Sequence, residues 1–238
     1  MLCEEFIVTF HPKRRVIAMK NGFSWKNITH VLLDLDGTLL DRDFDDTFYE
    51  LTVPREYARK NGISFEAARE KVLAIYRREE GTLNWFDIEY WSRELEMDLC
   101  TLKIRESKKI RPLPGTWEFL DFVRNLGKSM HLFTDAHPQA LAIKLERVPL
   151  KGYFDSIVSA FDVGCTKKES RFWEEAQRLI EFDSATSLFV DDRPQVLERA
   201  SRFGVAYVFH KVGATSTRLV ECHDGFFPLV DFSEILEG

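Results

Sequence analysis

Five short apolar runs, each followed by a loop and then by helical periodicity, constrain the fold of this chain most strongly. Short, fully apolar runs are typical of parallel strands that are buried on both faces. The runs are Val31–Leu33, Met130–Phe133, Ile157–Val158, Leu188–Val190 and Ala206–Phe209. Strands that alternate with helices of ordinary length predict an α/β fold with a doubly wound, Rossmann-like parallel sheet.

Amphipathic segments fill the later intervals between these runs. Thr116 can cap a helix whose apolar face includes Phe119, and Gly127 follows the end of that helix. Residues Arg171–Glu181 and Gln195–Phe203 predict the next two helices. The order of strands and helices therefore fits a sheet with helices on both sides.

The first interval between runs is much longer than one crossover helix needs, at about 95 residues. Within it Ser64 begins one amphipathic helix, and a second helix carries Ile88, Trp91 and Leu95. We therefore expect a helical cap over residues 45–110, inserted into a core made of residues 25–44 and 111–238. Residues 1–24 have no clear period and are interpreted as a loose N-terminal extension or as a misassigned start.

Composition excludes several classes of protein. The formal net charge of −6 argues against a nucleic-acid binder that works through clustered cations. Four cysteines lie far apart without a C-x-x-C pair, so reduced thiols are expected. The chain shows neither a signal-peptide pattern nor 18 consecutive apolar residues, and we expect a cytoplasmic protein without a membrane span.

Two carboxylates follow the first apolar run, in the segment Asp34-Leu35-Asp36-Gly37-Thr38. Ligands of open α/β sheets bind beyond the carboxyl ends of the strands, so Asp34 and Asp36 lie where a site is expected. Two acids at the end of a buried strand repel each other and lose hydration. A bound cation would offset that cost.

Other strand ends carry further polar groups. The fourth run ends in Asp191-Asp192, and if its strand neighbours the first, the acids converge on a hard cation such as Mg²⁺. The second run ends in Thr134-Asp135, followed by a predicted helix start. Lys167 follows the third run and offers a point charge suited to a phosphoryl oxygen.

Together these four elements, in this chain order, resemble the motifs of the haloacid dehalogenase-like hydrolase superfamily. The resemblance implies that Asp34 is a nucleophile and Asp36 a general acid and base. It also implies that Asp34, the backbone carbonyl of Asp36 and Asp191 hold Mg²⁺, while Thr134 and Lys167 hold a phosphoryl group. Asp135 and Asp192 are expected to bind phosphate or to support the residues that do.

The acid at position 36 favours phosphoryl transfer over dehalogenation, because the dehalogenating branch of the superfamily lacks a carboxylate there. A carboxylate nucleophile splits phosphate ester hydrolysis into formation and hydrolysis of an aspartyl-phosphate. The predicted activity is that of a Mg²⁺-dependent phosphomonoester hydrolase.

The expected cap suggests the substrate. The segments Thr82–Phe86 and Glu89–Trp91 resemble the cap of bacterial GMP/IMP 5′-nucleotidases of this superfamily. Asn84 can hydrogen-bond a base or a ribose, and Trp85 can either stack on a purine or belong to the cap's own small core, which is the favoured expectation for Trp91. The expected partner is thus a small phosphate ester such as a purine nucleoside monophosphate.

Several alternatives remain open from the sequence. The substrate could be a sugar phosphate or phosphoglycolate, the reaction could be that of a phosphomutase, and a non-catalytic phosphate sensor is a third reading. Asp135 and Lys168 depart from the superfamily's usual residues, and His137 is interpreted as a helix-start residue. A further acidic group is interpreted as solvated or capping and consists of Asp41, Asp43, Asp45 and Asp46.

Overall fold

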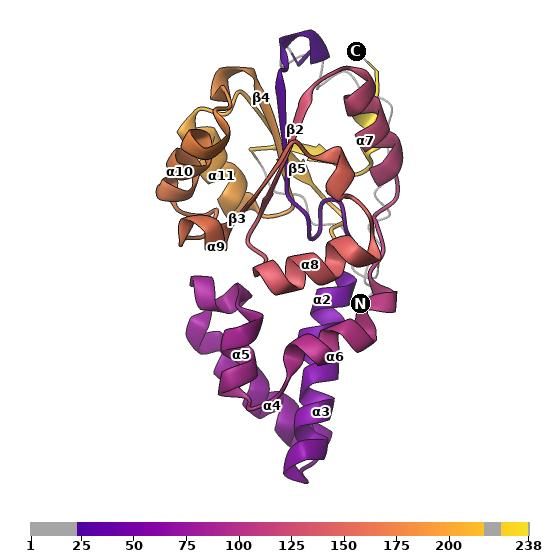
Figure 1. The fold of residues 1–238 in the computed structure, drawn as a ribbon, viewed down its shortest axis with the longest axis vertical. Coiled ribbons are helices and arrows are strands. Elements are labelled where there is room, and N and C mark those ends of the chain that lie inside the picture. Colours follow the sequence, from indigo (N-terminus) through magenta and orange to yellow (C-terminus); the bar gives the residue numbers. More distant parts are fainter. Residues whose placement is uncertain (1–22, 217–224, 238) are drawn as a thin grey trace, which may run out of the picture.

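The computed structural model describes residues 23–216 and 225–237 of the chain. Six strands within these residues form one parallel sheet, in the order β3-β2-β1-β4-β5-β6 (Figure 1). The strands are β1 (His30–Leu33), β2 (Ser129–Thr134), β3 (Ser156–Ser159), β4 (Ser187–Asp191), β5 (Tyr207–Lys211) and β6 (Phe227–Leu229). This is the predicted α/β fold with a doubly wound sheet.

The sheet has one strand more than the five that the apolar runs predict. Strand β6 pairs with β5 at the edge of the sheet and is only three residues long. It contains Pro228, and proline lacks the N–H group that a central strand needs. So short a segment with a central proline carries no recognisable strand period.

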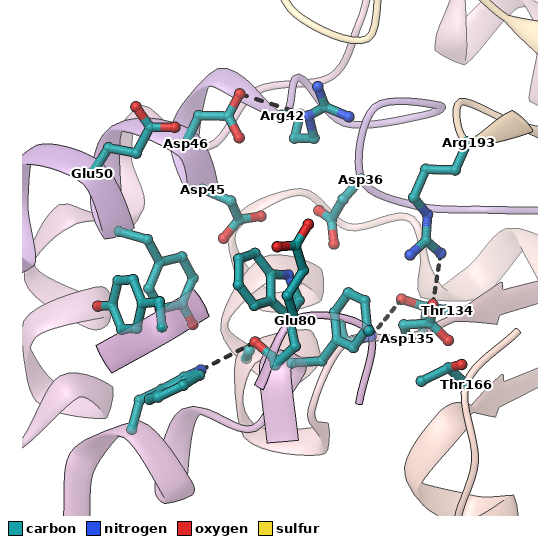
Figure 2. A pocket seen from close by; sticks show the side chains of 18 of the residues that line it. Asp36, Arg42, Asp45, Asp46, Glu50, Glu80, Thr134, Asp135, Thr166 and Arg193 are labelled. Carbon is teal, nitrogen blue, oxygen red and sulfur yellow. Dashed lines mark hydrogen bonds and ion pairs between the residues drawn. The ribbon is translucent and has the colours of Figure 1, made fainter. Parts of the chain in front are cut away.

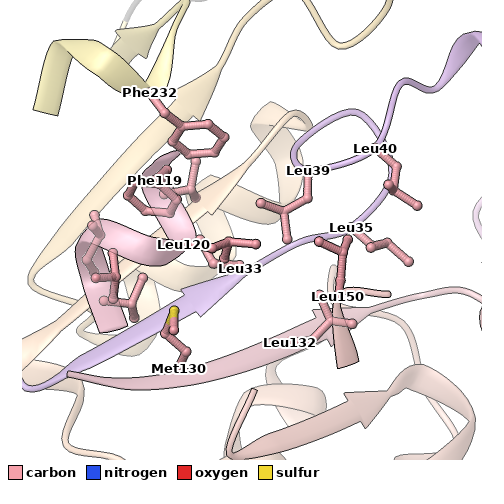
Figure 3. Close-up of a cluster of buried hydrophobic side chains, with 14 of the residues drawn as sticks. Leu33, Leu35, Leu39, Leu40, Phe119, Leu120, Met130, Leu132, Leu150 and Phe232 are labelled. Atoms are coloured by element: carbon pink, nitrogen blue, oxygen red, sulfur yellow. The ribbon is translucent and has the colours of Figure 1, made fainter. Parts of the chain in front are cut away.

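Helices cover both faces of the sheet because successive side chains of a strand point to opposite sides. Val31 and Leu33 of β1 belong to one apolar cluster, whereas Leu32 belongs to another. Figure 3 shows part of the first cluster, in which the rings of Phe119 and Phe232 stack with their centroids 4.2 Å apart. The helices against the first cluster are α7 (Thr116–Asn125) and α8 (Pro138–Arg147), and those against the second are α9 (Ala160–Val163), α10 (Ser170–Ile180) and α11 (Pro194–Phe203).

The predicted helices after the second strand agree with α10 and α11 to within one residue at each end. The expected cap at Thr116 is wrong, because Thr116 is the first helical residue and Gly115 occupies the cap position. The Thr116 hydroxyl instead donates a hydrogen bond to the Leu39 carbonyl oxygen at 2.9 Å. That bond ties the start of α7 to the loop after β1.

A separate group of helices lies between β1 and β2 in the chain and packs beside one end of the sheet (Figure 1). We call residues 43–109 the helical insert. Its longer elements are α2 (Asp43–Thr47), the π-helix η3 (Phe48–Thr52), α3 (Val53–Asn61), α4 (Phe65–Tyr76), α5 (Ile88–Glu94) and α6 (Leu99–Glu106).

The helical insert has its own apolar cluster, which also includes Ala140 of α8. As predicted, Ser64 caps α4, since its hydroxyl accepts a hydrogen bond from the Ala67 backbone N–H at 3.2 Å. Trp91 is 2% exposed within this cluster, as expected of a residue in the cap's own core. The insert is therefore packed by its own side chains as well as against helix α8 of the core.

The chain leaves and rejoins the core through one narrow connection, which we call the neck and define as residues 39–41 and 111–113. Leu40 and Pro112 face each other in an antiparallel bridge. The Asp41 backbone N–H donates to the Arg111 carbonyl oxygen at 3.0 Å, and the Leu113 N–H donates to the Leu39 carbonyl oxygen at 2.9 Å. Both passes of the chain are thus fixed together by backbone hydrogen bonds.

Short 3₁₀-helices connect the main elements. They are η2 (Trp25–Asn27), η4 (Arg77–Glu79), η5 (Leu83–Phe86), η6 (Ser107–Lys109), η7 (Lys151–Tyr153), η8 (Ser184–Thr186) and η9 (Phe232–Ile235). Across the described ranges, none of the helices combines the length and apolar character needed to cross a bilayer.

The interpretation of residues 1–24 as an extension lies outside the described residues, except at its end. Phe23 packs edge-on against Trp25 and Tyr207, and Ser24 caps η2. Cys100 and Cys165, the two cysteines within the described ranges, are free thiols.

Candidate active site

Three carboxylates meet at the carboxyl ends of β1 and β4, which are neighbouring strands. Asp34 directly follows β1, and its backbone N–H donates to the Val190 carbonyl oxygen at 3.0 Å. Asp191 ends β4, and Asp192 follows it. One oxygen from each of these three buried carboxylates lies within 4.8 Å of the others. The structure thus brings together acids that are more than 150 residues apart in the chain.

Lys167 lies among these carboxylates and is fully buried. Its ammonium group donates to Asp34 Oδ1, to Asp191 Oδ2 at 2.6 Å and to the Phe133 carbonyl oxygen at 3.0 Å. The lysine carbonyl in turn accepts a hydrogen bond from the Trp173 indole at 2.9 Å, which fixes the loop before α10. Lys167 therefore has one defined position between the acids.

The three acids differ in their affinity for a proton. Burial raises the pKa of Asp34 to about 8, and Lys167 opposes that rise. Burial also raises the pKa of Asp192, to about 6, together with the adjacent charge of Asp191. Although burial disfavours the charge of Asp191, Lys167 and Arg193 lower its pKa below the ordinary value.

The residues around this cluster fit a hard divalent cation. Asp34 Oδ2 and Asp192 Oδ1 are buried carboxylate oxygens without a hydrogen-bond partner among the described residues. Gly37 has a φ of +90°, and a Cβ atom there would lie 2.5 Å from Asp192 Oδ2, so only glycine leaves this space free. Carboxylate oxygens and backbone carbonyls are the ligands that Mg²⁺ prefers.

The acid cluster contains the two expected carboxylate ligands, Asp34 and Asp191, and adds Asp192 to them. Asp192, which was expected near the phosphate, lies with Asp34 and Asp191, and Arg42 Nη1 donates to its Oδ2 at 2.5 Å. Asp36, expected to offer its backbone carbonyl, has its carboxylate turned to a different partner. The contact between Arg42 and Asp192 was not predicted, because the sequence shows Arg42 only as one charged residue in a charged loop.

The Asp36 carboxylate binds Lys144 of α8, whose ammonium donates to Asp36 Oδ2 at 2.6 Å. The same ammonium donates to Asp45 Oδ2 at 2.6 Å, and Lys103 of α6 donates to Asp45 Oδ1 at 2.5 Å. Figure 2 shows the carboxylates of Asp36 and Asp45 side by side at the cavity. The interpretation of Asp45 as a solvated or capping acid is wrong, because two buried lysines bind it.

Two other members of that acidic group also have defined partners. Asp41 is 4% exposed and accepts hydrogen bonds from the Asp43 backbone N–H at 3.0 Å and from Arg111 Nε at 3.0 Å. Burial opposes ionisation of Asp41, but these donors and Ser216 lower its pKa overall. Asp46 lies 3.6 Å from Arg42 Nε.

Thr134 and Asp135 lie at the end of β2, beside the acid cluster. The Thr134 hydroxyl accepts from the Ala136 backbone N–H at 3.0 Å. Asp135 Oδ1 accepts from the Lys167 backbone N–H at 2.9 Å, and its Oδ2 accepts from Arg193 Nη2 at 2.6 Å (Figure 2). The additional negative charge of Asp135 is therefore neutralised within the site.

His137 begins α8 as the sequence suggested. It is the N-cap residue, and its ring accepts a hydrogen bond from the Gln139 backbone N–H at 3.3 Å. Its other ring nitrogen lies 3.6 Å from Asp87 Oδ1 of the insert. This geometry makes it a contact between α8 and the insert.

A cavity of about 600 Å³ connects the acid cluster with the helical insert. Asp34, Asp36 and Asp192 line it on the side of the sheet. Aromatic side chains line it on the side of the insert, and these are Tyr49, Tyr76, Trp85, Phe86 and Trp91. Charged residues of the insert complete this side, namely Asp45, Asp46, Glu50, Arg69, Arg77, Glu80 and Lys103.

The two expected binding residues of the insert lie differently. Trp85 lines the cavity and is 38% exposed, so its ring is available to a ligand. Asn84 is not among the lining residues, and its amide donates to Glu79 Oε2 at 3.0 Å. Because Glu79 also accepts from Tyr90 and Thr82, Asn84 belongs to a hydrogen-bonded group that holds the η5 turn.

Comparison with known proteins agrees with this arrangement. The family model of haloacid dehalogenase-like hydrolases matches residues 28–204. The GMP/IMP nucleotidase YrfG of Escherichia coli (strain K12) is 34% identical over 189 residues, which cover 79% of this chain and 85% of that protein. The glyceraldehyde 3-phosphate phosphatase of Pyrococcus abyssi is 23% identical over 191 residues, or 72% of this chain and 80% of that protein.

A solved structure supports the same fold. The crystal structure of a HAD phosphatase from Thermococcus onnurineus superposes with a TM-score of 0.74. The match covers 87% of this chain and 95% of that one at 22% sequence identity. At that identity the likeness concerns the fold of the core and the insert together.

Proposed function

The chain belongs to the haloacid dehalogenase-like hydrolase family, and we propose from this that it is a Mg²⁺-dependent phosphomonoesterase acting on purine nucleoside 5′-monophosphates. The observation that carries the proposal is a continuous cavity of about 600 Å³ that is lined by Asp34 and Asp36 and also by the aromatic residues of the insert. Such a cavity can hold a phosphate at its acidic end and a planar base at its aromatic end.

In the first step an Asp34 carboxylate oxygen forms a bond to phosphorus as the bond from phosphorus to the ester oxygen breaks. Asp36 donates a proton to that leaving oxygen. Asp34 then carries the phosphoryl group as an aspartyl-phosphate. Lys167 lies within hydrogen-bond distance of Asp34 and counters the repulsion between two anions.

In the second step a water molecule attacks the same phosphorus atom and gives a proton to Asp36. The bond between phosphorus and Asp34 breaks, which releases phosphate and restores both carboxyl groups. Thr134 lines the cavity at the end of β2, where its hydroxyl can contact a phosphoryl oxygen.

We assign the metal to Asp34, Asp191 and Asp192, with the backbone carbonyl of Asp36 as a further ligand. When bound, Mg²⁺ neutralises the negative charge that spreads over the phosphoryl oxygens in the transition state. We also propose that residues 45–110 act as a cap that selects the substrate over a core formed by residues 25–44 and 111–238.

The base is assigned to the aromatic end of the cavity. Trp85 and Phe86 are adjacent in η5 and both line the cavity, so their rings can stack on a purine. The relative from Escherichia coli, named a GMP/IMP nucleotidase, supports this class of substrate.

A small sugar phosphate is the second candidate. The relative from Pyrococcus abyssi, named a glyceraldehyde 3-phosphate phosphatase, matches 72% of this chain and supports it. Such a substrate would leave much of the aromatic end of the cavity unfilled, which favours the larger nucleotide.

A phosphate-release panel tests the proposal. With Mg²⁺ present, we expect kcat/KM to be highest for GMP or IMP, lower for CMP and UMP, and lower again for glyceraldehyde 3-phosphate and phosphoglycolate. EDTA should abolish release, and Asp34→Asn should reduce it by at least about 1000-fold, since it removes the nucleophile.

Asp121→Asn is the matched control, because Asp121 is an exposed residue of α7 whose carboxylate accepts a hydrogen bond from the Tyr153 hydroxyl at 2.7 Å. Its activity should equal that of the unaltered protein. Full activity in Asp34→Asn would reject the mechanism, and a preference for a sugar phosphate would reject the substrate.

A further inference from the structure

A row of alternating charges leads from Asp36 into the helical insert. In order along the row, Asp36 binds Lys144, Lys144 binds Asp45, and Asp45 binds Lys103, at distances of 2.6, 2.6 and 2.5 Å. Lys144 comes from α8 of the core, Asp45 from α2 and Lys103 from α6. We call these four residues the charged row.

The two lysines of the charged row are almost entirely removed from water. The side chains of Lys103 and Lys144 are 1% and 4% exposed, and that of Asp45 is 17% exposed. Burying an ammonium group is costly, and a buried ion pair is often no more stable than apolar residues of the same volume. Two buried lysines that share one aspartate at the wall of a cavity therefore need an explanation other than the stability of the fold.

Lys103 has surroundings that hold it firmly. Its ammonium lies 4.6 Å from the ring centroid of Phe48 and 4.7 Å from that of Tyr49, in addition to its bond with Asp45. Cations are attracted to aromatic faces at such distances. The far end of the row is thus anchored inside the insert, and Asp45 presents a fixed acceptor to Lys144.

Asp36 needs such an anchor. It follows β1 in a loop rather than lying within the strand, and 23% of its side chain is exposed at the cavity. A side chain that donates or accepts a proton must lie within hydrogen-bond reach of the reacting oxygen, and a loss of orientation reduces the rate steeply. Lys144 supplies a short, charge-assisted hydrogen bond to one carboxylate oxygen, Oδ2, of an aspartate that lines the cavity.

We propose that Lys144 is a positioning residue for Asp36, and that Asp45 and Lys103 hold Lys144 in place from the insert. This inference rests on the proposed function, because it takes Asp36 as the group that protonates the leaving oxygen. It adds that the orientation of this core residue depends on the packing of the insert, through side chains on α2 and α6.

Two substrates with different leaving groups distinguish a loss of Asp36 positioning from a general disruption of the active site. A nucleoside leaves as an alkoxide and needs the proton of Asp36, whereas the nitrophenolate of p-nitrophenyl phosphate leaves without one. For Lys144→Met we expect kcat/KM to fall by about 10- to 100-fold with GMP, and by less than about 3-fold with p-nitrophenyl phosphate. The KM for GMP should change little, since Lys144 is not assigned to the substrate.

Lys211→Met is the matched control, because Lys211 is also a buried lysine, 3% exposed, but lies in β5 and donates to the carbonyl oxygens of Val212 and Val230. We expect it to lower the melting temperature while the ratio of kcat/KM for the two substrates stays unchanged. That result would separate the loss of any buried lysine from the loss of Lys144.

Asp45→Asn keeps the test decisive if Lys144→Met does not fold. It keeps the volume of the side chain but removes the charge that holds Lys144, so the same selective loss with GMP is expected, at about 3- to 10-fold. An equal loss with both substrates in either folded variant would overturn the inference. So would unchanged kcat/KM with GMP.

The unaltered protein distinguishes this inference from the proposed function. If it hydrolyses GMP and p-nitrophenyl phosphate, and Asp34→Asn hydrolyses neither, the proposed mechanism stands whatever Lys144→Met does. If the unaltered protein hydrolyses neither ester in Mg²⁺, both the function and the inference built on it are rejected.

Discussion

Asp135 places a further carboxylate beside a site proposed to bind a dianionic phosphate. Its charge is balanced by Arg193, which donates to it at 2.6 Å, and by the backbone N–H of Lys167 at 2.9 Å. The superfamily usually has asparagine at this position, so Asp135 and Arg193 are best understood as a pair. An aspartate here is compatible with phosphate binding only while the arginine remains.

The pair can be tested by removing one partner and then both. In Arg193→Ser the buried Asp135 carboxylate loses its partner and should repel the substrate, lowering kcat/KM for GMP by about 10- to 100-fold. The double variant Asp135→Asn with Arg193→Ser should recover activity to within about 3-fold of the unaltered protein, a coupling that a double-mutant cycle measures.

If the double variant is as poor as Arg193→Ser alone, neutralisation of Asp135 is not the role of Arg193. Direct contact of the guanidinium with the substrate, or the loss of its positive charge 3.7 Å from Asp191, would then explain the loss. Asp135→Asn by itself serves as the control, and we expect a small effect because asparagine can still accept from the Lys167 N–H.

The convergence of the motif residues could be predicted from the sequence, because each follows an apolar run and parallel strands bring their carboxyl ends together. Their roles in the reaction stay a prediction. Lys144 and Arg193 could not, because their partners Asp36 and Asp135 are 108 and 58 residues away along the chain. A lysine on the same helix face as Leu141 and Ala140 was the available signal for Lys144, since that face is buried.

At the scale of single elements, β1 and β2 each carry a histidine. His30 is the first residue of β1 and His131 is the third residue of β2, so both precede the strand ends that carry the acids. His30 Nδ1 lies 3.3 Å from His131 Nε2, and the rings stack with centroids 5.5 Å apart. His131 is 4% exposed. Burial, together with His30, lowers the pKa of His131 to about 4.

This strand contact predicts an acid-sensitive sheet. A histidine with a lowered pKa stays neutral in the folded protein and takes up a proton on unfolding, so the stability it provides is present above about pH 6.5 and is lost as the pH falls toward 4. We expect a loss of about 2–3 kcal/mol over that range, measured by urea unfolding at several pH values.

His131→Gln is the comparison, since glutamine does not titrate. The difference in unfolding free energy between the two proteins should change with pH by the amount expected for one histidine. A constant difference from pH 7 to pH 4 would show that His131 does not titrate with folding.

The elements that the sequence predicted well are those with a strong, uninterrupted period. Five strands, α10 and α11 were predicted from apolar runs and amphipathic faces. Strand β6 was not, because Pro228 interrupts a segment of three residues. Helix α3 was also missed, since the period before Ser64 is interrupted by charged residues and by the π-helix turn of η3.

At the scale of the whole molecule, a net charge of −6 is unevenly distributed. Three of the acids converge on one buried position, and two of their oxygens have no hydrogen-bond partner within residues 23–216 and 225–237. A divalent cation bound there offsets a repulsion that the fold otherwise has to bear. The cation should therefore stabilise the folded chain as well as assist the reaction.

Thermal unfolding with and without Mg²⁺ tests this expectation apart from activity. At about 100 times its Kd, a ligand that binds only the folded state adds about 2.7 kcal/mol, which for a chain of this size corresponds to a rise in Tm of about 5–10 °C. Asp191→Asn should remove most of this rise, because it removes one of the three converging carboxylates.

NaCl at matched ionic strength is the control. In both proteins it should raise the Tm by less than Mg²⁺ raises the Tm of the unaltered protein. An equal Mg²⁺ effect in Asp191→Asn and in the unaltered protein would mean that the ion stabilises the chain elsewhere.

The neck has a consequence for how such a chain can diversify. Because residues 39–41 and 111–113 are already held together by backbone hydrogen bonds, whatever lies between them is closed at its base. A different helical segment, of different length and sequence, can be joined at the same two points without stretching the sheet or moving Asp34. The neck thus makes the insert's half of the cavity an exchangeable module for recombination in evolution and for grafting in the laboratory.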